Sequence, residues 1–200
     1  MNRKIYQWAL LVACSALAAC SSNSNQPVVY IKPAVTAEWM GSTEMLLRES
    51  IQGSPFTLHQ QGDAWVVTAP AAQSFNPDRP ALLMPAVLRP LTKLAKLMEG
   101  RPDTAVLILG HTDATSNDRA NHTLSTERAR SVASIFSLSG MNGGRMTRLG
   151  MGSSYILPAA RNAAHNHRVE IIIAPRTHIK DVIAVYRPAH TRLLALSETR

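Results

Sequence analysis

The order of structural elements in this chain follows from residues 104–132, TAVLILGHTDATSNDRANHTLSTERARSV. Residues 104–109 are apolar without polar alternation, which predicts a central strand, covered on at least one face, that ends at Gly110. A polar loop is expected to reach Leu124, and Ser125 is suited to cap a following helix. The buried face of that helix is expected to comprise apolar residues at spacings of three and four: Ala129, Val132, Ala133, Ile135 and Phe136.

Two charged side chains of this segment are expected to share a crevice. Asp113 lies just past the carboxyl end of the predicted strand, and Arg128 follows fifteen positions later in the first turn of the predicted helix. Ligands of open α/β sheets bind beyond the carboxyl ends of strands, and the free N–H groups at a helix N-terminus favour anions. The Arg128 guanidinium suits a carboxylate, while the Asp113 carboxylate accepts from an ammonium group. The pair is therefore complementary to the zwitterionic end of an amino acid.

The same residues also have an interpretation that involves no ligand. Asp113 and Arg128 could form an ion pair that holds the loop to the helix, although an exposed pair contributes only about 0–1 kcal/mol. Thr112 and Asn121 could close the loop through hydrogen bonds to backbone groups, as short polar side chains do in turns. These two residues are secondary candidates for the site, together with Leu124 as a wall.

Hydrophobic patterning predicts further elements on both sides of this segment. Two extended runs at 56–59 and 65–68, separated by the turn-forming residues 60–63, predict a hairpin. Residues 80–98 carry apolar side chains at helical spacing before Gly100, and two prolines in the early turns predict that the regular helix begins late. The remaining expected elements are a strand at 146–149, a turn of helix at 158–164 and a strand at 168–173.

This alternation of strands and helices predicts the α/β class, as an α+β two-layer sandwich with βαβαβ order. The sheet is expected to have mixed direction, with the helices on one face. The domain is assigned to residues 56–175, and the basic residues 176–200 to a C-terminal extension whose apolar side chains are a candidate partner site.

The chain begins with the features of a bacterial export signal. Two basic residues precede a short apolar run that ends at 17–20 in Leu-Ala-Ala-Cys. This pattern indicates a secretory signal at 1–19, and the cysteine after the small residues resembles the lipobox of bacterial lipoproteins. An ordinary cleaved signal and a transmembrane helix are the alternatives, but the run is short for a membrane span and a polar, tether-like segment follows it. The lipobox implies a lipid anchor at Cys20, and Ser21 in place of aspartate implies sorting to the outer membrane, with the domain facing the periplasm.

Removal of the signal leaves 181 residues, which suit one domain with extensions at its ends. Residues 20–55 are assigned to the tether, with a short helix at 39–51. Cys14 leaves with the signal and Cys20 is modified, so the mature chain keeps no thiol for a disulfide or a thiolate metal site. The formal net charge of +8 indicates acidic partners, and export favours carboxylate-rich cell-wall peptides over nucleic acid.

The central segment also resembles a known family. GHTD at 110–113, followed by NxxLSxxRAxxV at 121–132, is the signature of the C-terminal domain of outer membrane protein A and of the peptidoglycan-associated lipoprotein, and every fixed letter is present. Residues 74–76 and 166–170 match the flanking segments of the family more loosely. This agreement favours ligand binding over a structural ion pair.

The resemblance implies noncovalent binding of peptidoglycan through the diaminopimelate of its stem peptide, which Asp113 and Arg128 would grip. Phe75 and Arg168 join the candidate site through the flanking matches. Two positions depart from the family pattern, because Ser116 stands near a usual glycine and His167 replaces the first arginine of the closing segment. The loss of that permanent charge is expected to weaken binding or to make it respond to pH.

Other kinds of site are less well supported by the sequence. Four histidines could converge on a metal ion, but no HExxH motif or closed Cys/His spacing is present. They are His111, His122, His165 and His167. The glycine-rich stretches 140–144 and 150–152 lack the lysine of phosphate loops and are expected to be turns. No nucleophile lies in a recognisable catalytic motif, so we expect neither an enzyme nor a cofactor.

Two functions therefore stay open on the sequence alone. The first is a tether with a lipid at Cys20 and a peptidoglycan-binding domain, which could serve an envelope, secretion, motility or signalling assembly. The second is a protein-interaction lipoprotein of such an assembly with little wall affinity. Its contact surfaces would be residues 39–51 and the C-terminal extension.

Overall fold

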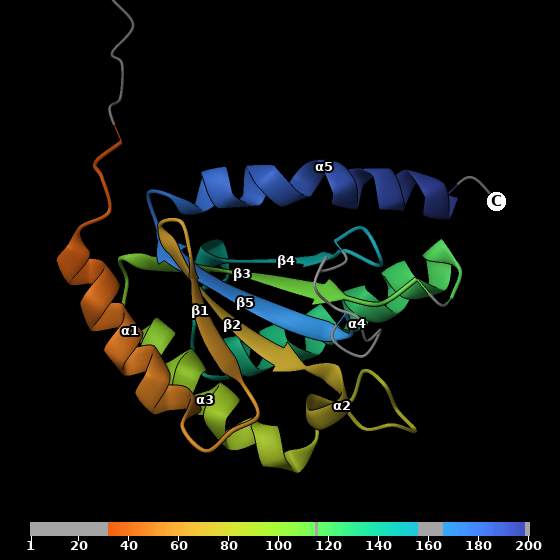
Figure 1. Cartoon of the computed structure of the whole chain (residues 1–200), viewed down its shortest axis with the longest axis horizontal. Coiled ribbons are helices and arrows are strands. Elements are labelled where there is room, and N and C mark those ends of the chain that lie inside the picture. Colours follow the sequence, from red (N-terminus) through yellow and green to blue (C-terminus); the bar gives the residue numbers. More distant parts are fainter. Residues whose placement is uncertain (1–31, 115, 156–165, 199–200) are drawn as a thin grey trace, which may run out of the picture. The chain divides into compact units, whose positions relative to one another are not determined.

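A five-stranded sheet of mixed direction lies at the centre of the described chain (Figure 1). The computed structural model describes residues 32–114, 116–155 and 166–198. The predicted signal, the lipidation site Cys20 and the turn of helix expected at 158–164 lie outside the described residues. The strands are β1 (Thr57–Gln61), β2 (Ala64–Pro70), β3 (Thr104–His111), β4 (Met146–Gly150) and β5 (Arg168–Pro175). They lie in the order β1-β2-β5-β3-β4, with β3 and β4 parallel and the other neighbouring pairs antiparallel.

The strands predicted from the sequence are confirmed. β1 and β2 form the expected hairpin around Gly62, whose φ of 56° is readily adopted by glycine. Every residue of β3 is buried, in agreement with its uninterrupted apolar sequence. β5, the last strand in the chain, pairs with both β2 and β3 and so occupies the middle of the sheet.

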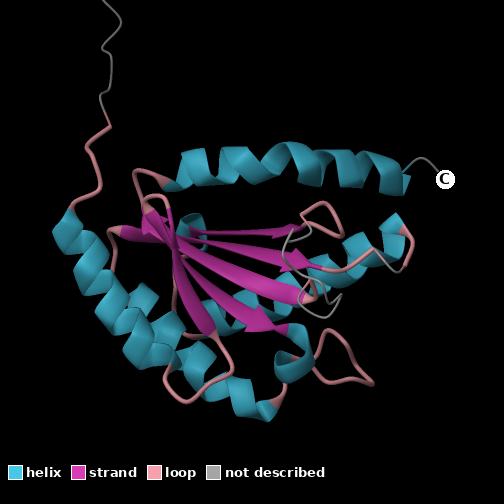
Figure 2. Cartoon of the chain, in the orientation of Figure 1, coloured by secondary structure: helices cyan, strands magenta, loops and turns pink. Residues whose placement is uncertain are grey.

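Helices cover both faces of this sheet (Figure 2). They are α1 (Ala37–Ile51), α2 (Ala71–Ser74), α3 (Pro85–Glu99), α4 (Asp118–Leu138) and α5 (Ile179–Glu198), with a 3-10 turn, η1, at Gly143–Arg145. α1, α3 and α4 contribute to the core on one face, and α5 contributes to the core on the other. Among the described helices, none is both long and apolar enough to cross a membrane.

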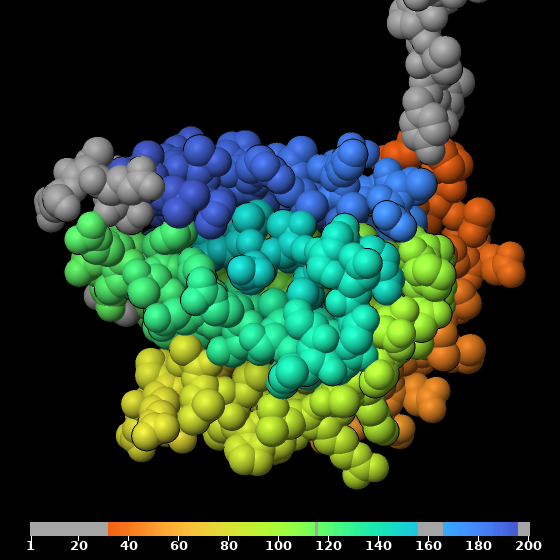
Figure 3. All heavy atoms as spheres, turned by 180° about the vertical axis from the view of Figure 1, so that it is seen from behind, coloured from red at the N-terminus to blue at the C-terminus, as the bar shows by residue number. Residues whose placement is uncertain are grey.

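The α/β class and the mixed sheet are confirmed, but the expectation that all helices lie on one face is corrected by α5. This helix forms within the predicted C-terminal extension. Its Ile179, Ile183 and Tyr186 recur at helical spacing and pack with Leu107 and Ile172 of the sheet. Four of the apolar side chains considered as a partner surface, Ile179, Ile183, Tyr186 and Leu193, are thus buried within the domain, whereas Val185 is exposed. Figure 3 shows from behind that the later part of α5 (dark blue) also lies next to the start of α4 (green).

α4 begins earlier than the sequence predicted. Its N-cap is Asn117, whose side chain accepts a hydrogen bond from the Ala120 N–H at 2.8 Å. Ser125, predicted as the cap, lies inside the helix, where its hydroxyl donates to the His122 carbonyl and accepts from the Gly152 N–H. The first two turns escaped prediction because they carry mostly polar side chains and therefore show no apolar stripe.

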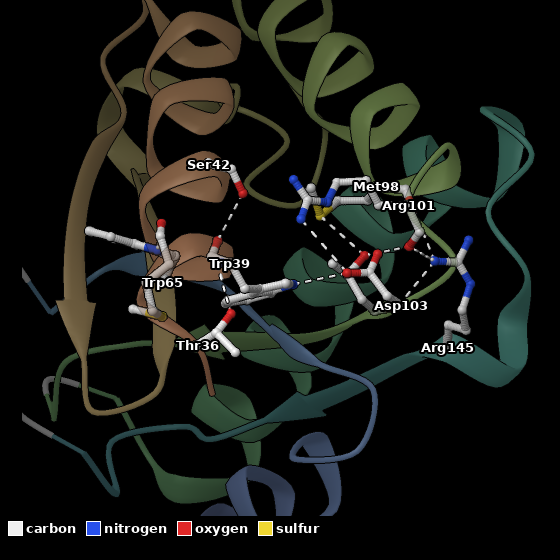
Figure 4. Close-up of polar contacts among 10 residues, drawn as sticks. Thr36, Trp39, Ser42, Trp65, Met98, Arg101, Asp103 and Arg145 are labelled. Atoms are coloured by element: carbon white, nitrogen blue, oxygen red, sulfur yellow. Dashed lines mark hydrogen bonds and ion pairs between the residues drawn. The ribbon is translucent and has the colours of Figure 1, made fainter. Parts of the chain in front are cut away.

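The helix predicted at 39–51 is present as α1 and packs into the domain (Figure 4). Leu47 is fully buried in the core shared with α3 and α4. The Trp39 indole donates to Asp103 Oδ2 at 3.0 Å, and the Trp65 indole donates to the Met40 carbonyl at 3.0 Å. These contacts hold α1 against the corner where β3 begins.

Candidate ligand-binding site

The His167 imidazole lies between Asp113 and Arg128 and contacts both, and these three side chains form the site that is called the cleft below. Asp113 follows the end of β3, Arg128 comes from the middle of α4, and His167 immediately precedes β5. His167 Nε2 lies 3.1 Å from Asp113 Oδ2, and His167 Nδ1 lies 3.4 Å from Arg128 Nη1. The sequence prediction that an acid and a guanidinium meet beyond the end of the central strand is thus realised geometrically. Arg128 does not lie in the first turn of its helix, however, because α4 starts at Asp118.

The guanidinium of Arg128 is held from two further directions. Its Nε donates to the Pro80 carbonyl at 2.8 Å, and its central carbon lies 5.3 Å from the centre of the Phe75 ring. Burial lowers the pKa of Arg128 below its ordinary value, and the nearby Asp113 charge opposes this shift. The side chain is therefore an oriented, largely desolvated donor.

Phe75 lies in the site, as expected. The secondary candidates Thr112 and Asn121 mainly make contacts that hold the loop in place. Thr112 is buried, and its backbone N–H donates to the Gly152 carbonyl at 2.9 Å. Asn121 Nδ2 donates to the Ser116 carbonyl at 2.9 Å and so ties the loop to α4. Leu124 is half-buried on the same helix. Loop closure, considered for Thr112 and Asn121, is therefore part of how the site is held.

Arg168 lies in a different cluster, so its predicted place beside Asp113 and Arg128 is corrected. Side chains alternate along β5, and Arg168 and Glu170 fall on the face covered by α5. Arg168 Nε donates to Glu170 Oε1 at 2.7 Å, and His111 Nε2 lies 3.3 Å from Glu170 Oε2.

Burial would raise the pKa of Glu170, but hydrogen bonds and charge from His111 and Arg168 lower it to about 2. Burial lowers the pKa of His111 from its ordinary value of 6.5, against the opposing effect of Glu170. The cluster thus holds an ionised carboxylate inside the protein. It stabilises the end of the sheet rather than lining the cleft.

Two groups at the cleft were not assigned by sequence reasoning. The Pro80 carbonyl carries no sequence signal, because any residue supplies a carbonyl and only the fold brings this one to Arg128. His167 was named as a departure from the family pattern and as one of four histidines considered for a metal ion, and neither observation indicated that it would lie between the two charged residues.

A metal centre gains no support from the described residues, where no group of three or more His, Cys, Asp or Glu side chains could hold an ion. His111 contacts Glu170, His167 contacts Asp113, and the His122 ring lies 5.4 Å from the His190 ring. His165 lies outside the described residues.

Comparison with known proteins identifies the family. The sequence model of the OmpA family matches residues 74–170, which include the cleft. The chain is 31% identical over 128 residues to the outer-membrane lipoprotein YfiB of Pseudomonas aeruginosa, covering 62% of this chain and 73% of that protein. The chain belongs to the OmpA family.

Two further proteins resemble parts of the chain. The probable lipoprotein YiaD of Escherichia coli is 32% identical over 140 residues, covering 68% of this chain and 64% of YiaD. The peptidoglycan-binding protein ArfA of Mycobacterium bovis is 37% identical over 98 residues, covering 46% of this chain. This chain spans less than two thirds of the length of YiaD and only 29% of ArfA.

A solved structure supports the fold assignment. The cell wall anchor of the T6SS from Pseudomonas aeruginosa matches with a TM-score of 0.55 at 22% identity, covering 72% of this chain and 99% of the anchor. At this identity the similarity concerns the fold, which is that of an OmpA-like domain.

Proposed function

We propose that this protein is an outer-membrane lipoprotein that binds peptidoglycan noncovalently and so tethers the membrane, or an envelope assembly, to the cell wall. The ligand would be the diaminopimelate residue of the stem peptide, and no catalytic step is involved. The observation that carries the proposal is the pairing of Asp113 and Arg128 across one cleft, bridged by a single imidazole. An amino-acid head fits such a pair, because its ammonium donates to the carboxylate and its carboxylate accepts from the guanidinium.

The positions of α1 and the cleft at opposite ends of the central strand support the same function. The chain enters the domain near α1, where Trp39 contacts Asp103 at the start of β3. Asp113 lies beyond the other end of this strand, whose eight residues span about 25 Å at ~3.3 Å per residue. A domain held at its first end therefore directs the cleft away from the attachment point, as a wall-binding tether requires.

Co-sedimentation with purified peptidoglycan tests the proposal. We expect the purified protein to pellet with peptidoglycan, and Asp113→Ala or Arg128→Ala to weaken binding by more than about tenfold, because each leaves a buried charge without its partner. The exposed Asp63 and Arg130 supply matched controls, since Asp63→Ala and Arg130→Ala remove the same charges away from the cleft. Equal pelleting of all five proteins would reject this cleft as the binding site. Circular dichroism identifies any variant that has lost its fold.

The lipid anchor requires a separate experiment. Metabolic labelling with a palmitate analogue, followed by separation of the inner and outer membranes, is expected to give a labelled protein in the outer membrane. Cys20→Ser is expected to abolish the label and release the protein from the membrane fraction. Label on the Cys20→Ser variant, or wild-type protein in the inner membrane, would contradict the proposed anchoring.

The alternative function, protein interaction with little wall binding, loses part of each of its two proposed contact surfaces, although Met45 and Val185 stay exposed. Leu47 and Ile51 of α1 are buried in the core, as are Ile183 and Tyr186 of α5. We therefore prefer peptidoglycan binding as the function of the domain. Envelope and secretion-system proteins stay possible additional partners.

A further inference from the structure

The cleft between Asp113 and Arg128 is already bridged by a side chain of the protein itself. His167 contacts the carboxylate through Nε2 and the guanidinium through Nδ1. The tautomer that carries its proton on Nε2 donates to Asp113 and accepts from Arg128, so it satisfies both contacts. A zwitterionic amino-acid head would use the same two partners in the same sense. The imidazole therefore reproduces the hydrogen-bonding pattern of the proposed ligand.

We propose that His167 is an internal competitor that must leave the cleft before a zwitterionic amino-acid head can bind. This inference rests on the proposed function and adds a residue that sets the affinity of the same site. When a side chain of the protein occupies a site, the apparent affinity for a ligand equals the affinity of the open site multiplied by the fraction of molecules in which the site is open. A ligand with only a carboxylate or only an ammonium replaces one of the two contacts and is expected to displace the imidazole poorly. His167 thereby favours ligands that carry both groups.

Displacement requires only a rotation of the His167 side chain. The His167 carbonyl accepts from the Ala71 N–H at 2.8 Å, and the next residue, Arg168, pairs with Pro70 in the sheet. The backbone is thus fixed on the C-terminal side of the imidazole. The side chain itself is 31% exposed.

Arg128 has no comparable freedom. Its guanidinium is anchored by the Pro80 carbonyl and lies against the Phe75 ring, as described above. The Asp113 side chain is only 9% exposed. The two ligand-binding groups are therefore held in place, and the imidazole is the component that can move.

Titration of the full-length protein with meso-diaminopimelate, followed by calorimetry, tests this inference. His167→Ala removes both competing contacts, so we expect it to bind about tenfold more tightly than the wild type. His167→Gln is expected to bind like the wild type, because its amide can donate to Asp113 and accept from Arg128. His59→Ala removes an exposed histidine of β1 and serves as the matched control. Equal or weaker binding by His167→Ala would overturn the inference and identify His167 as a bystander or a direct ligand contact.

A measurement on the wild type covers the case in which a variant misfolds. ¹⁵N NMR of the imidazole is expected to show the Nε2-protonated tautomer in the free protein and a solvent-exposed ring on saturation with diaminopimelate. Ring signals that stay unchanged at saturation would overturn the proposed displacement. Pimelate, which lacks the amino groups, is expected to leave these signals near their free positions.

The outcomes separate this inference from the proposed function. If the wild type binds and Asp113→Ala abolishes binding, the function stands whatever His167→Ala does, and only the competition is in question. If neither the wild type nor His167→Ala binds diaminopimelate or peptidoglycan, both proposals fail. Binding by His167→Ala alone would establish the competition in its strongest form.

Discussion

Gly110 shows how one residue sets the distance between the central strand and α4. A Cβ built at this position would lie 1.9 Å from the Ser125 carbonyl oxygen and 2.7 Å from its carbon, both backbone atoms that cannot rotate away. Because Arg128 follows Ser125 by less than one turn of α4, any displacement of the helix here also displaces the guanidinium. The glycine is therefore required both for packing and for the geometry of the cleft.

Gly110→Ala is accordingly expected to lower the free energy of unfolding by about 3 kcal/mol, because the helix must shift or the strand must bend. Urea denaturation measures the change. Gly41→Ala is the matched control, since a Cβ at Gly41 meets nothing within 4 Å in the interior of α1. It is expected to stabilise the protein by roughly 0.5–1 kcal/mol. Similar midpoints for the two variants would contradict the close approach of β3 and α4.

Glu170 gives the domain an acid-sensitive stability. In the folded protein its pKa is about 2, below its ordinary value of 4.5, so on acidification the unfolded chain takes up the proton first. The resulting stabilisation, about 3 kcal/mol, is complete above pH 4.5 and is lost as the pH falls toward 2. The lowered pKa of His111 acts in the same direction and begins to reduce stability below pH 6.5.

Glu170→Gln is expected to remove the part of this pH dependence that lies between pH 4.5 and 2, and also to destabilise the protein at pH 7. Urea midpoints measured from pH 7 to pH 3 provide the test. A variant whose stability falls with acid as steeply as that of the wild type would show that Glu170 is not the responsible group.

At the level of elements, Arg145 joins the end of α3 to the start of β3. Its buried guanidinium donates to four carbonyls, those of Met98, Glu99, Arg101 and Thr104, at 2.7–3.1 Å. Two of these carbonyls, those of Met98 and Glu99, lie at the end of α3, where a helix has unpaired acceptors and a negative dipole end. Figure 4 shows Arg145 beside Arg101 and Asp103, at the corner where α1 also docks.

Arg145→Leu is expected to cost about 2–4 kcal/mol, because it leaves several buried acceptors without a donor. Arg148→Leu, at an exposed position of β4, is expected to change stability by less than about 0.5 kcal/mol. Thermal unfolding of the two variants distinguishes a buried helix-capping arginine from a general effect of lost positive charge. Equal melting temperatures would argue against the capping role.

The elements differ in how far the sequence predicted them, for physical reasons. β3 was predictable because an uninterrupted apolar run has few alternatives, and α3 because its apolar residues recur at spacings of three and four before Gly100. The start of α4 was not predictable from the apolar pattern, because the two turns that follow its N-cap at Asn117 are largely polar. The covering role of α5 depends on Leu107 and Ile172 needing a partner on their face of the sheet, which no local pattern records.

The residues of the cleft also differ in how far the sequence predicted them. The charged pair was predictable because its spacing follows from a motif that fixes one strand end and one helix. Pro80 and His167 are distant from Arg128 in sequence and meet it only through tertiary packing. Arg168 was misplaced because one step along a strand moves a side chain to the opposite face of the sheet.

At the scale of the whole molecule, the sheet is stabilised by a separate core on each face. The second core depends on α5, which contributes the buried Ile183. Val185, two positions further along the same helix, is exposed. Ile183→Ala is expected to lower the free energy of unfolding by roughly 2–4 kcal/mol, whereas Val185→Ala is expected to leave it nearly unchanged. Chemical denaturation provides the comparison. A stability loss for Val185→Ala equal to that of Ile183→Ala would mean that α5 packs differently.

In the proposed tethering function, in which the protein joins two surfaces, the direction of β3 has a mechanical consequence. Tension would enter where α1 docks at the start of this strand and leave through the cleft beyond its end, so the load runs parallel to the strands. β3 pairs with β5 along its full length and with β4 on the other side. Hydrogen bonds perpendicular to the pulling direction bear a shearing load together instead of unzipping in sequence. The domain is therefore built to yield at the small ligand contact before its sheet comes apart.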